Sequence, residues 1–233
     1  MYKKQIIAAV IFARGGSSLY KKNMRLLKGI PLIGYSIGPA LKSQYIDKVI
    51  VATDDQEIEA TSLEMGAEVF NLPSEITTDA SGTDAALLYM TDWFEQNGID
   101  VIVYMQPTDL FKESEWMDEC ISRLIDGNFS SVFVGCATHK NYWYISDDKC
   151  QRAIHIKNPY INRQQKSPIY REDTGLGAAI RVSSIIKNQN RLGDNPHLIE
   201  KEYLFFDLHN ELDFYLAEAF LEFQKWQRLQ YQL

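Results

Sequence analysis

The chain has 233 residues, of which 45% are hydrophobic and 24% are charged, and its formal net charge is −7 at pH 7. This charge disfavours a protein that binds nucleic acid through a general basic surface, although a local basic pocket can still hold a small anion. No apolar run approaches the roughly 20 residues of a membrane-spanning helix. We therefore expect neither a nucleic acid nor a membrane as a partner.

The cysteine count and the N-terminal residues predict the compartment. Cys120, Cys136 and Cys150 are an odd number of cysteines without the spacing of a metal site, which favours reduced thiols. The N-terminus leads directly into an apolar segment and shows no signal-peptide cleavage pattern. Both features indicate a cytoplasmic protein.

The first apolar segment is followed by a turn that suits phosphate. Residues 6–12 are seven consecutive apolar residues, which predicts a strand buried on both faces of a parallel sheet. A turn rich in glycine, serine and cationic residues follows at residues 13–23. Paired glycines let backbone N–H groups approach a ligand, and N–H groups, hydroxyls and cations together bind phosphate. The alternative is an ordinary strand-to-helix turn with solvated charges, because such motifs have many false matches.

Strands and helices alternate regularly over the first 135 residues. We expect helices over residues 31–43, 55–65, 84–96 and 113–125, and further strands over residues 48–53, 68–73, 101–105 and 131–135. This alternation predicts an α/β fold with a doubly wound, mostly parallel sheet. Ligands of such sheets bind beyond the carboxyl ends of the strands. That rule groups the turn after the first strand with residues 53–54, 106–108 and 207 as one candidate site.

The alternation stops after Cys136. Residues 139–171 are rich in Tyr, Asn, Gln and Pro and contain short alternating pieces such as residues 142–146. We interpret this segment as a small β-excursion that serves dimerisation or acts as a lid. The alternative is that its aromatic side chains cap the sheet within one monomer.

The C-terminal part contains a second glycine turn, a strand and a helix. Residues 173–179 form the turn, which leads to a strand or short helix ending near residue 187, and residues 203–208 predict the last core strand. Asn210 and Asp213 have the spacing of a capping box at the start of a helix. The apolar positions of that helix have amphipathic spacing: Leu212, Leu216, Ala219, Phe220, Phe223 and Trp226.

Several of these stretches follow one another in the order of a known enzyme family. They are residues 13–17 with 22–23, then 31–33, 51–54, 105–108, 163–165 and 207–214. Together they extend over most of the chain and resemble the acylneuraminate cytidylyltransferases, which are related to the CMP-KDO synthetases. The resemblance implies one cytidylyltransferase domain over residues 1–233 with a Rossmann-like nucleotidyltransferase fold. It also implies a homodimer that transfers CMP from CTP to the anomeric hydroxyl of a nonulosonic or related ulosonic acid and releases pyrophosphate.

The resemblance assigns roles to individual residues. Arg14, Lys22 and Asp207 are the implied catalytic residues, with Asp207 as the ligand of Mg²⁺ or Mn²⁺ and His209 as a second candidate ligand. The implied nucleotide-binding residues are Ala13, Arg14, Gly15, Gly16, Ser17, Lys22, Asn23, Asp79, Ala80 and Ser81. The implied binding residues for the acidic sugar are Gln106, Thr108, Arg163, Gln164 and Arg181.

Several features depart from the family pattern. The glycine turn is one residue shorter than usual and lacks its proline, and Ser18 stands where a lysine is common. His209 occupies the place of a second metal-binding aspartate, Lys112 that of an arginine, and Arg181 that of a tyrosine. Magnesium prefers hard oxygen ligands, which makes an imidazole a poor substitute. The departures indicate a variant subgroup that uses an acidic sugar other than N-acetylneuraminate. Two alternatives stay open: a CTP-binding protein that has lost catalysis, and a transferase of similar fold that uses a nucleotide sugar as donor.

Overall fold

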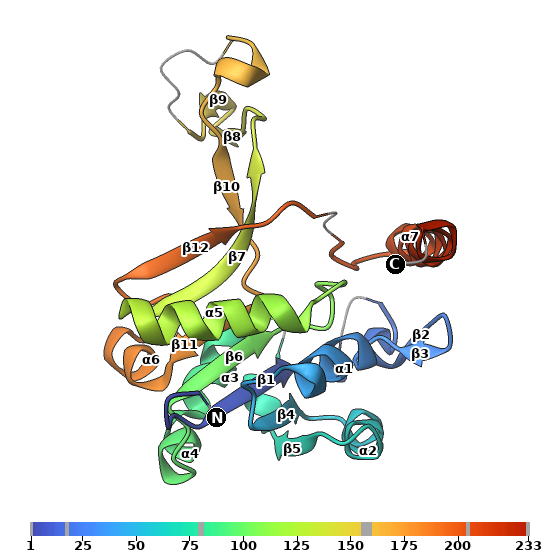
Figure 1. The fold of residues 1–233 in the computed structure, drawn as a ribbon, viewed down its shortest axis with the longest axis vertical. Helices are drawn as coiled ribbons and strands as arrows, with labels where there is room; N and C mark the ends of the chain where they lie inside the picture. Colours follow the sequence, from blue (N-terminus) through green and yellow to red (C-terminus); the bar gives the residue numbers. More distant parts are fainter. Residues whose placement is uncertain (1, 17–18, 79–81, 155–159, 204–205, 232–233) are drawn as a thin grey trace.

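A central sheet with helices on both faces forms the body of the protein (Figure 1). The computed structural model describes residues 2–16, 19–78, 82–154, 160–203 and 206–231. Seven strands of the sheet follow the order β10-β7-β11-β6-β1-β4-β5, and an eighth strand, β12, also pairs with β7. Their bounds are β1 (Ile7–Phe12), β4 (Lys48–Thr53), β5 (Glu68–Asn71), β6 (Val101–Met105), β7 (Ser131–Thr138), β10 (Ile169–Glu172), β11 (Leu176–Arg181) and β12 (Pro196–Glu200).

The sheet is mostly parallel, as predicted. Strand β1 pairs in parallel with both β4 and β6, β4 pairs in parallel with β5, and β12 with β7. Strand β11 is antiparallel to β6 and β7, and β10 is antiparallel to β7. The apolar run of β1 lies at the centre because successive side chains point to opposite faces: Ile7 and Ile11 enter one core cluster and Val10 enters the other.

Each face of the sheet is covered by helices. The first core cluster receives α1 (Gly34–Lys42), α2 (Gln56–Glu64) and α5 (Ser114–Gly127), and the second receives α3 (Thr83–Tyr89), α4 (Thr91–Gln96) and α6 (Val182–Asn188). Short elements complete this part: η1 (Lys22–Met24), β2 (Leu26–Leu27), β3 (Ile30–Pro31) and η2 (Ser74–Ile76). Within the described ranges no helix is long and apolar enough to span a bilayer.

Two predicted helices differ in detail from the structure. Pro31 belongs to β3, and α1 begins only at Gly34. The helix predicted over residues 84–96 is two helices, α3 and α4, which meet at the buried Met90. The hydroxyl of Thr91 donates to the carbonyl of Leu88 at 2.7 Å, and such a local side-chain bond competes with the helical ladder.

Residues 139–171 form the expected β-excursion, here called the arm. It contains a separate two-stranded sheet of β8 (Trp143–Ser146) and β9 (Lys149–Arg152), then η3 (Arg163–Gln165), and returns to the main sheet through β10. Figure 1 shows the arm projecting from the edge of the body. The aromatic residues of the β8–β9 hairpin are exposed, so in this chain they do not cap the sheet.

The last core strand predicted over residues 203–208 is wrong for the residues that are described. Asp207 makes only an isolated bridge to Asp109, and Phe206 instead packs its ring 5.2 Å from that of Phe111 in a side cluster with the last helix. The remaining strand of the sheet is β12, which the sequence reasoning missed. In β12 only Ile199 is buried, so the segment lacks the apolar run of a core strand.

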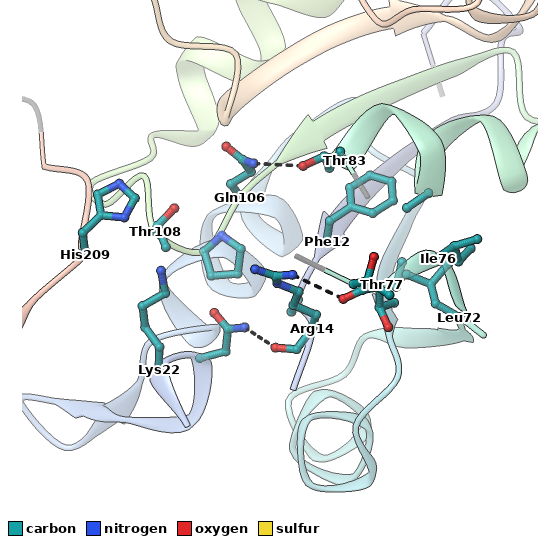
Figure 2. Close-up of a pocket in the computed structure, with 17 residues that line it drawn as sticks. Phe12, Arg14, Lys22, Leu72, Ile76, Thr77, Thr83, Gln106, Thr108 and His209 are labelled. Atoms are coloured by element: carbon teal, nitrogen blue, oxygen red, sulfur yellow. Dashed lines mark hydrogen bonds between the residues drawn. The ribbon is translucent and has the colours of Figure 1, made fainter. Parts of the chain in front are cut away.

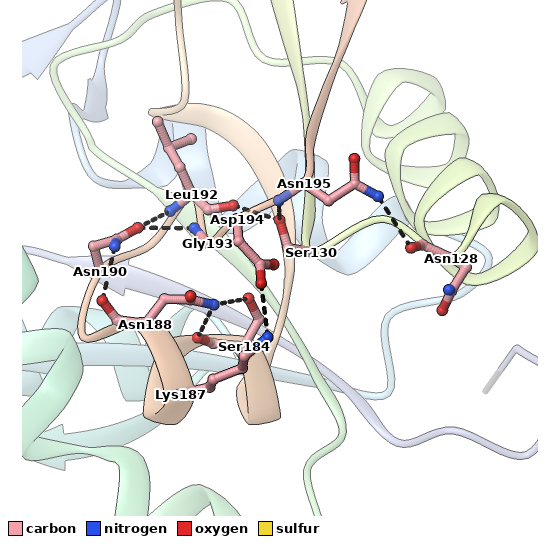
Figure 3. Close-up of polar contacts among 10 residues, drawn as sticks. All are labelled: Asn128, Ser130, Ser184, Lys187, Asn188, Asn190, Leu192, Gly193, Asp194 and Asn195. Atoms are coloured by element: carbon pink, nitrogen blue, oxygen red, sulfur yellow. Dashed lines mark hydrogen bonds and ion pairs between the residues drawn. The ribbon is translucent and has the colours of Figure 1, made fainter.

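A polar loop places β12 against the sheet (Figure 3). The side-chain oxygen of Asn190 accepts the N–H groups of Leu192 at 3.0 Å and Gly193 at 2.8 Å. The hydroxyl of Ser130 donates to the carbonyl of Leu192 at 2.7 Å and accepts the N–H of Asn195 at 2.9 Å. Short polar side chains thus fix the turn from α6 into β12 by bonding backbone groups.

The C-terminal helix α7 (Glu211–Tyr231) begins with the predicted cap. Asp213 N–H donates to Asn210 Oδ1 at 3.2 Å, and Asn210 N–H donates to Asp213 Oδ2 at 2.9 Å. The helix packs, however, mainly through positions other than the predicted ones: Phe214 and Ala217 are buried, whereas Leu216 is exposed. Of the predicted positions, Phe220 does pack, with its ring 4.8 Å from that of Phe111. Figure 1 shows α7 at the edge of the molecule.

Candidate active site

A pocket of about 360 Å³ opens beyond the carboxyl ends of β1, β4 and β6. The residues that follow these strands line it, together with η1, the start of α3 and His209 (Figure 2). This is the edge that the parallel-sheet rule selects. The predicted site residues Ala13, Arg14, Lys22, Asn23, Gln106 and Thr108 all line this one pocket.

Two cations lie on one side of the pocket. The guanidinium of Arg14 donates to the carbonyl of Thr77 at 3.3 Å, and the amide of Asn23 donates to the carbonyl of Arg14 at 2.9 Å. The ammonium of Lys22 donates to the carbonyl of Leu208 at 3.1 Å, which joins the glycine turn to the segment before α7. Burial lowers the pKa of Lys22, Asp207 opposes this effect, and Arg14 adds to it. The two cations and Asp207 are therefore close enough to interact.

The glycine turn is held by carboxylates of the neighbouring strand. The N–H of Gly15 donates to Asp54 Oδ1 at 2.8 Å, and the hydroxyl of Thr77 donates to Asp54 Oδ2 at 2.7 Å. A Cβ at Gly15 would lie 2.6 Å from Asp55 Oδ2, so a larger residue does not fit there. Asp54 thus fixes the turn, and the N–H of Gly15 points to Asp54 and is not free for a ligand.

Asp207 and His209 form a pair beside the pocket, which His209 lines. His209 Nε2 lies 2.6 Å from Asp207 Oδ2, and the N–H of His209 donates to Asp213 Oδ2 at 2.7 Å. In the described part of the chain no group of three His, Cys, Asp or Glu side chains could hold a metal ion. Magnesium is commonly held by one or two carboxylates together with substrate phosphates, and Asp207 fits that mode. His209 does not add a hard oxygen ligand.

Beside Asp207 lie two buried charged residues, Asp109 and Lys112, of which the sequence analysis singled out only Lys112, as a departure from the family's arginine. Asp109 and Lys112 are both buried, and the ammonium of Lys112 donates to the carbonyl of Asp109. Burial raises the pKa of Asp109 and lowers that of Lys112, because each charge has lost its water. A Cβ at Gly175 would overlap Asp109 Oδ2, so the second glycine turn makes room for this carboxylate. The only sequence signal for Asp109 was its position directly after residues 106–108.

Gln106 and Thr108 lie on the other side of the pocket, at the end of β6. The amide of Gln106 donates to the hydroxyl of Thr83 at 3.4 Å, in the first turn of α3. Thr78 and Gly82 line the pocket on either side of residues 79–81. Asp79, Ala80, Ser81 and Ser17 themselves lie outside the described residues.

Three predicted sugar-binding residues do not lie at this pocket. Arg181 pairs with Val101, at the opposite end of β6, and its guanidinium donates to the carbonyls of Phe129 at 2.9 Å and Leu124 at 2.8 Å. Arg181 thus lies apart from this pocket: antiparallel β11 carries it to the amino end of β6, where it binds a carbonyl near the end of α5. Arg163 and Gln164 lie on the arm, which Figure 1 shows projecting away from the body.

Two known proteins resemble the chain in sequence. An N-acylneuraminate cytidylyltransferase of Oncorhynchus mykiss is 33% identical over 143 residues, which are 60% of this chain and 32% of that protein. A CMP-N,N'-diacetyllegionaminic acid synthase of Legionella pneumophila is 29% identical over 227 residues, which are 93% of this chain and 96% of that protein. The chain spans about a third of the length of the first curated relatives it matches.

The fold also matches solved structures. A CMP:2-keto-3-deoxy-manno-octonic acid synthetase complexed with CTP aligns with a TM-score of 0.72 at 15% identity, over 94% of this chain and 100% of that chain. At this identity the likeness concerns the fold alone. The family model described as Cytidylyltransferase matches residues 8–224, from the first strand of the sheet into the last helix. The chain belongs to the cytidylyltransferase family.

Proposed function

We propose that the protein transfers CMP from CTP to the anomeric hydroxyl of a nonulosonic or related ulosonic acid. The observation that carries the proposal is that Arg14 and Lys22 line one pocket at the carboxyl edge of the sheet. Asp207 lies close enough to oppose the lowering of the Lys22 pKa by burial, and its partner His209 lines the same pocket. The relatives in the family, an acylneuraminate cytidylyltransferase and a CMP-legionaminic acid synthase, support the reaction class.

In this reaction the anomeric oxygen bonds to the α-phosphorus of CTP, the bond from that phosphorus to the bridging oxygen breaks, and pyrophosphate leaves. Such transfers need charge neutralisation and alignment more than covalent help. Arg14 and Lys22 are the proposed partners of the triphosphate. Because burial strips water from the Lys22 ammonium, a bound phosphate would supply the contacts that the ammonium lacks.

Asp207 is the proposed protein ligand of Mg²⁺ or Mn²⁺. When bound between this carboxylate and the nucleotide, the ion would neutralise phosphate charge and help to align the triphosphate. His209 is proposed to orient the Asp207 carboxylate through the 2.6 Å contact, because a nitrogen ligand suits magnesium poorly.

The two ends of the pocket suit two different ligands. Phe12, Leu72 and Ile76 provide an apolar wall beside the start of α3, which fits a flat nucleobase. Gln106 and Thr108 provide hydrogen-bonding groups on the opposite side, which fit the hydroxyls of a sugar acid. This division supports cytosine near residues 77–83 and the sugar near the end of β6.

We also propose that the protein is cytoplasmic and forms a homodimer that associates through the arm. The three cysteines are free thiols, which suits a reducing compartment. Arg163 lies on the arm and away from the pocket of its own chain. A sugar-binding role for Arg163 is therefore compatible with this fold only if the arm of a partner delivers it.

Pyrophosphate release from CTP tests the proposal. Each member of a panel of ulosonic and nonulosonic acids is mixed with CTP and Mg²⁺ or Mn²⁺, and we expect release with at least one acid. Arg14→Ala and Asp207→Asn should each lower kcat/KM at least about 100-fold, as for other electrostatic groups in active sites. The matched control Lys48→Ala removes a cation at the amino end of β4 and should leave the rate unchanged. CTP binding by calorimetry without turnover on any acid would contradict the proposal.

A further inference from the structure

A closed ring of hydrogen bonds joins the glycine turn to the segment that follows β5. The carboxylate of Asp54 accepts the N–H of Gly15 at 2.8 Å through Oδ1 and the hydroxyl of Thr77 at 2.7 Å through Oδ2. The carbonyl of Thr77 in turn accepts the guanidinium of Arg14 at 3.3 Å (Figure 2). Because Arg14 and Gly15 are consecutive residues, these three contacts close the ring. We call Asp54 and Thr77 the latch.

Asp54 is the fixed point of this ring. It directly follows Thr53, the buried last residue of β4. The next residue, Asp55, caps α2 by accepting the N–H groups of Glu57 at 2.8 Å and Ile58 at 3.0 Å. A strand and a capped helix therefore hold the backbone on both sides of Asp54, and its carboxylate starts from a fixed position.

Thr77 takes its position from Asp54. It follows η2, a single turn of three residues. Its hydroxyl also lies 3.2 Å from the carbonyl of Ser74. A hydroxyl donates only one proton, and a hydrogen bond to a carboxylate is stronger than one to a neutral carbonyl, so the shorter contact with Asp54 dominates. Asp54 thereby ties the segment after β5 to the end of β4.

The charge of Asp54 by itself opposes the binding of an anion. The residue is exposed beside the glycine turn, and like charges at short range repel each other even in water. A carboxylate at this place lowers the affinity for phosphate through its charge, and it can raise that affinity only through the groups that it holds in place. The two effects predict opposite results when the charge is removed.

Arg14 is the group that the latch holds. An arginine side chain loses conformational freedom when it is fixed on a ligand, and that loss weakens binding. Here the carbonyl of Thr77 already engages one of the five N–H donors of the guanidinium, at the wall of the pocket. Less freedom is then left to lose when a phosphate binds.

We propose that Asp54 and Thr77 are positioning residues for the triphosphate of CTP and that they act by holding the guanidinium of Arg14 in place. Neither residue has to contact the nucleotide for this role. The role rests on the proposed CTP site, but not on the transfer step.

Equilibrium binding of CTP and of cytidine tests this role. Asp54→Asn keeps the shape of the side chain but leaves one acceptor oxygen for two donors, so the ring opens. We expect this variant to weaken CTP binding, measured by calorimetry, at least about tenfold, and cytidine binding, measured by ligand-observed NMR, less than about twofold. A general loss of structure would weaken both ligands equally. Tighter CTP binding by Asp54→Asn would mean that the carboxylate acts only by repulsion, and would overturn the inference.

Thr77 provides a matched pair of variants. Thr77→Ser keeps the hydroxyl and should bind CTP like the wild type, whereas Thr77→Val replaces the hydroxyl with a methyl group and should weaken CTP binding as much as Asp54→Asn. Asp47 is the control, because its carboxylate accepts the N–H of Ile7 at 2.9 Å at the amino end of β1. Asp47→Asn should leave CTP binding unchanged. Wild-type affinity in Thr77→Val would contradict the proposed role.

Combining variants tests whether the effect passes through Arg14. Arg14→Ala removes the guanidinium that the latch holds. Adding Asp54→Asn to Arg14→Ala should therefore weaken CTP binding by less than about twofold, although Asp54→Asn alone weakens it at least about tenfold. The full loss in both backgrounds would mean that Asp54 acts on another part of the site, and would overturn the inference.

The wild-type protein separates the failure of this inference from that of the proposed function. A wild-type protein that does not bind CTP would overturn both. If the wild type binds CTP and the latch variants bind it equally well, only the inference fails, and pyrophosphate release still tests the transfer of CMP.

Discussion

Gly175 makes room for the buried carboxylate of Asp109 because glycine has no Cβ atom. A Cβ at position 175 would overlap the Asp109 carboxylate, which has no space to move because it is buried beside Lys112. We expect Gly175→Ala to lower the free energy of unfolding by about 1–3 kcal/mol, the usual cost of overpacking. Urea unfolding measures this value.

Repeating Gly175→Ala in a protein that lacks the Asp109 carboxylate tests whether the clash with that carboxylate causes the loss of stability. The cost of Gly175→Ala should shrink in an Asp109→Ala protein, because the clashing carboxylate is then absent. Gly38→Ala is the control, since nothing lies within 4 Å of a Cβ at that glycine. An equal cost in both backgrounds would show that Asp109 is not the reason for the glycine.

Arg191 contacts β6 and the first turn of α3, two elements that border the pocket. Its guanidinium donates to the hydroxyl of Tyr104 at 2.7 Å and lies 3.3 Å from Asp84 in the first turn of α3. Tyr104 is fully buried and its ring lies 5.6 Å from that of Phe12, which lines the pocket. Burial raises the pKa of Tyr104 to about 12, so the hydroxyl stays protonated at neutral pH.

We expect Arg191→Met to lower the free energy of unfolding by about 1–3 kcal/mol, because the buried hydroxyl of Tyr104 loses its partner and Asp84 loses its cation. The KM for CTP should rise because the start of α3 is no longer anchored. Tyr104→Phe keeps the ring and removes only the hydroxyl, so Arg191→Met should cost less in that background. Unfolding in urea and initial rates at varied CTP provide both readings; fully additive costs would argue against a direct coupling.

At the scale of elements, the cap of α7 links stability to the site. Asp213 accepts the N–H groups of both Asn210 and His209, so the same carboxylate begins the helix and places the imidazole beside Asp207. We expect Asp213→Ala to lower the free energy of unfolding by about 1 kcal/mol, as for other N-terminal caps. It should also lower kcat, because His209 no longer holds Asp207.

The conservative variant Asp213→Asn keeps one acceptor oxygen and should restore most of the stability. Thermal unfolding and turnover of both variants check this prediction. An Asp213→Ala protein with wild-type kcat would mean that the cap has no influence on the pair of Asp207 and His209.

The elements also show which sequence signals decide structure. The strands β1, β4 and β6 were predictable because both faces of each are buried and their sequences are therefore continuous apolar runs. Strand β12 lies at the edge of the sheet with a single buried residue, so it has no such run. Residues 203–208 are mostly aromatic and apolar, yet Phe206 packs beside α7. The prediction failed because an apolar segment buried in a side cluster has the same composition as one buried in a sheet.

The same limit applies to the faces of α7. Two apolar stripes run along this helix, and hydrophobic spacing does not say which one meets the body of the protein. Phe214 and Ala217 are the buried stripe because the preceding segment fixes the rotation of the helix through the Asn210 cap.

At the scale of the whole molecule, the part of the site that lies at the carboxyl ends of parallel strands was predictable from the sequence. Parallel strands bring Arg14, Asn23, Gln106 and Thr108 to one edge because their carboxyl ends coincide. Arg181 was misplaced because β11 runs antiparallel, a direction that its sequence does not encode. The contact between Asp109 and Gly175 was missed because the two residues come from distant parts of the chain.

The central claim is that Arg14, Lys22 and Asp207 surround a CTP molecule whose α-phosphorus is attacked by a sugar hydroxyl. Phosphorus NMR of the protein with CTP, Mg²⁺ and an ulosonic acid follows every phosphate in that reaction. The account predicts that the CTP signals give way to pyrophosphate and one new phosphodiester in equal amounts, and that Asp207→Asn prevents this. Unchanged CTP with every acid tested, or conversion of CTP to CDP and inorganic phosphate, would contradict it.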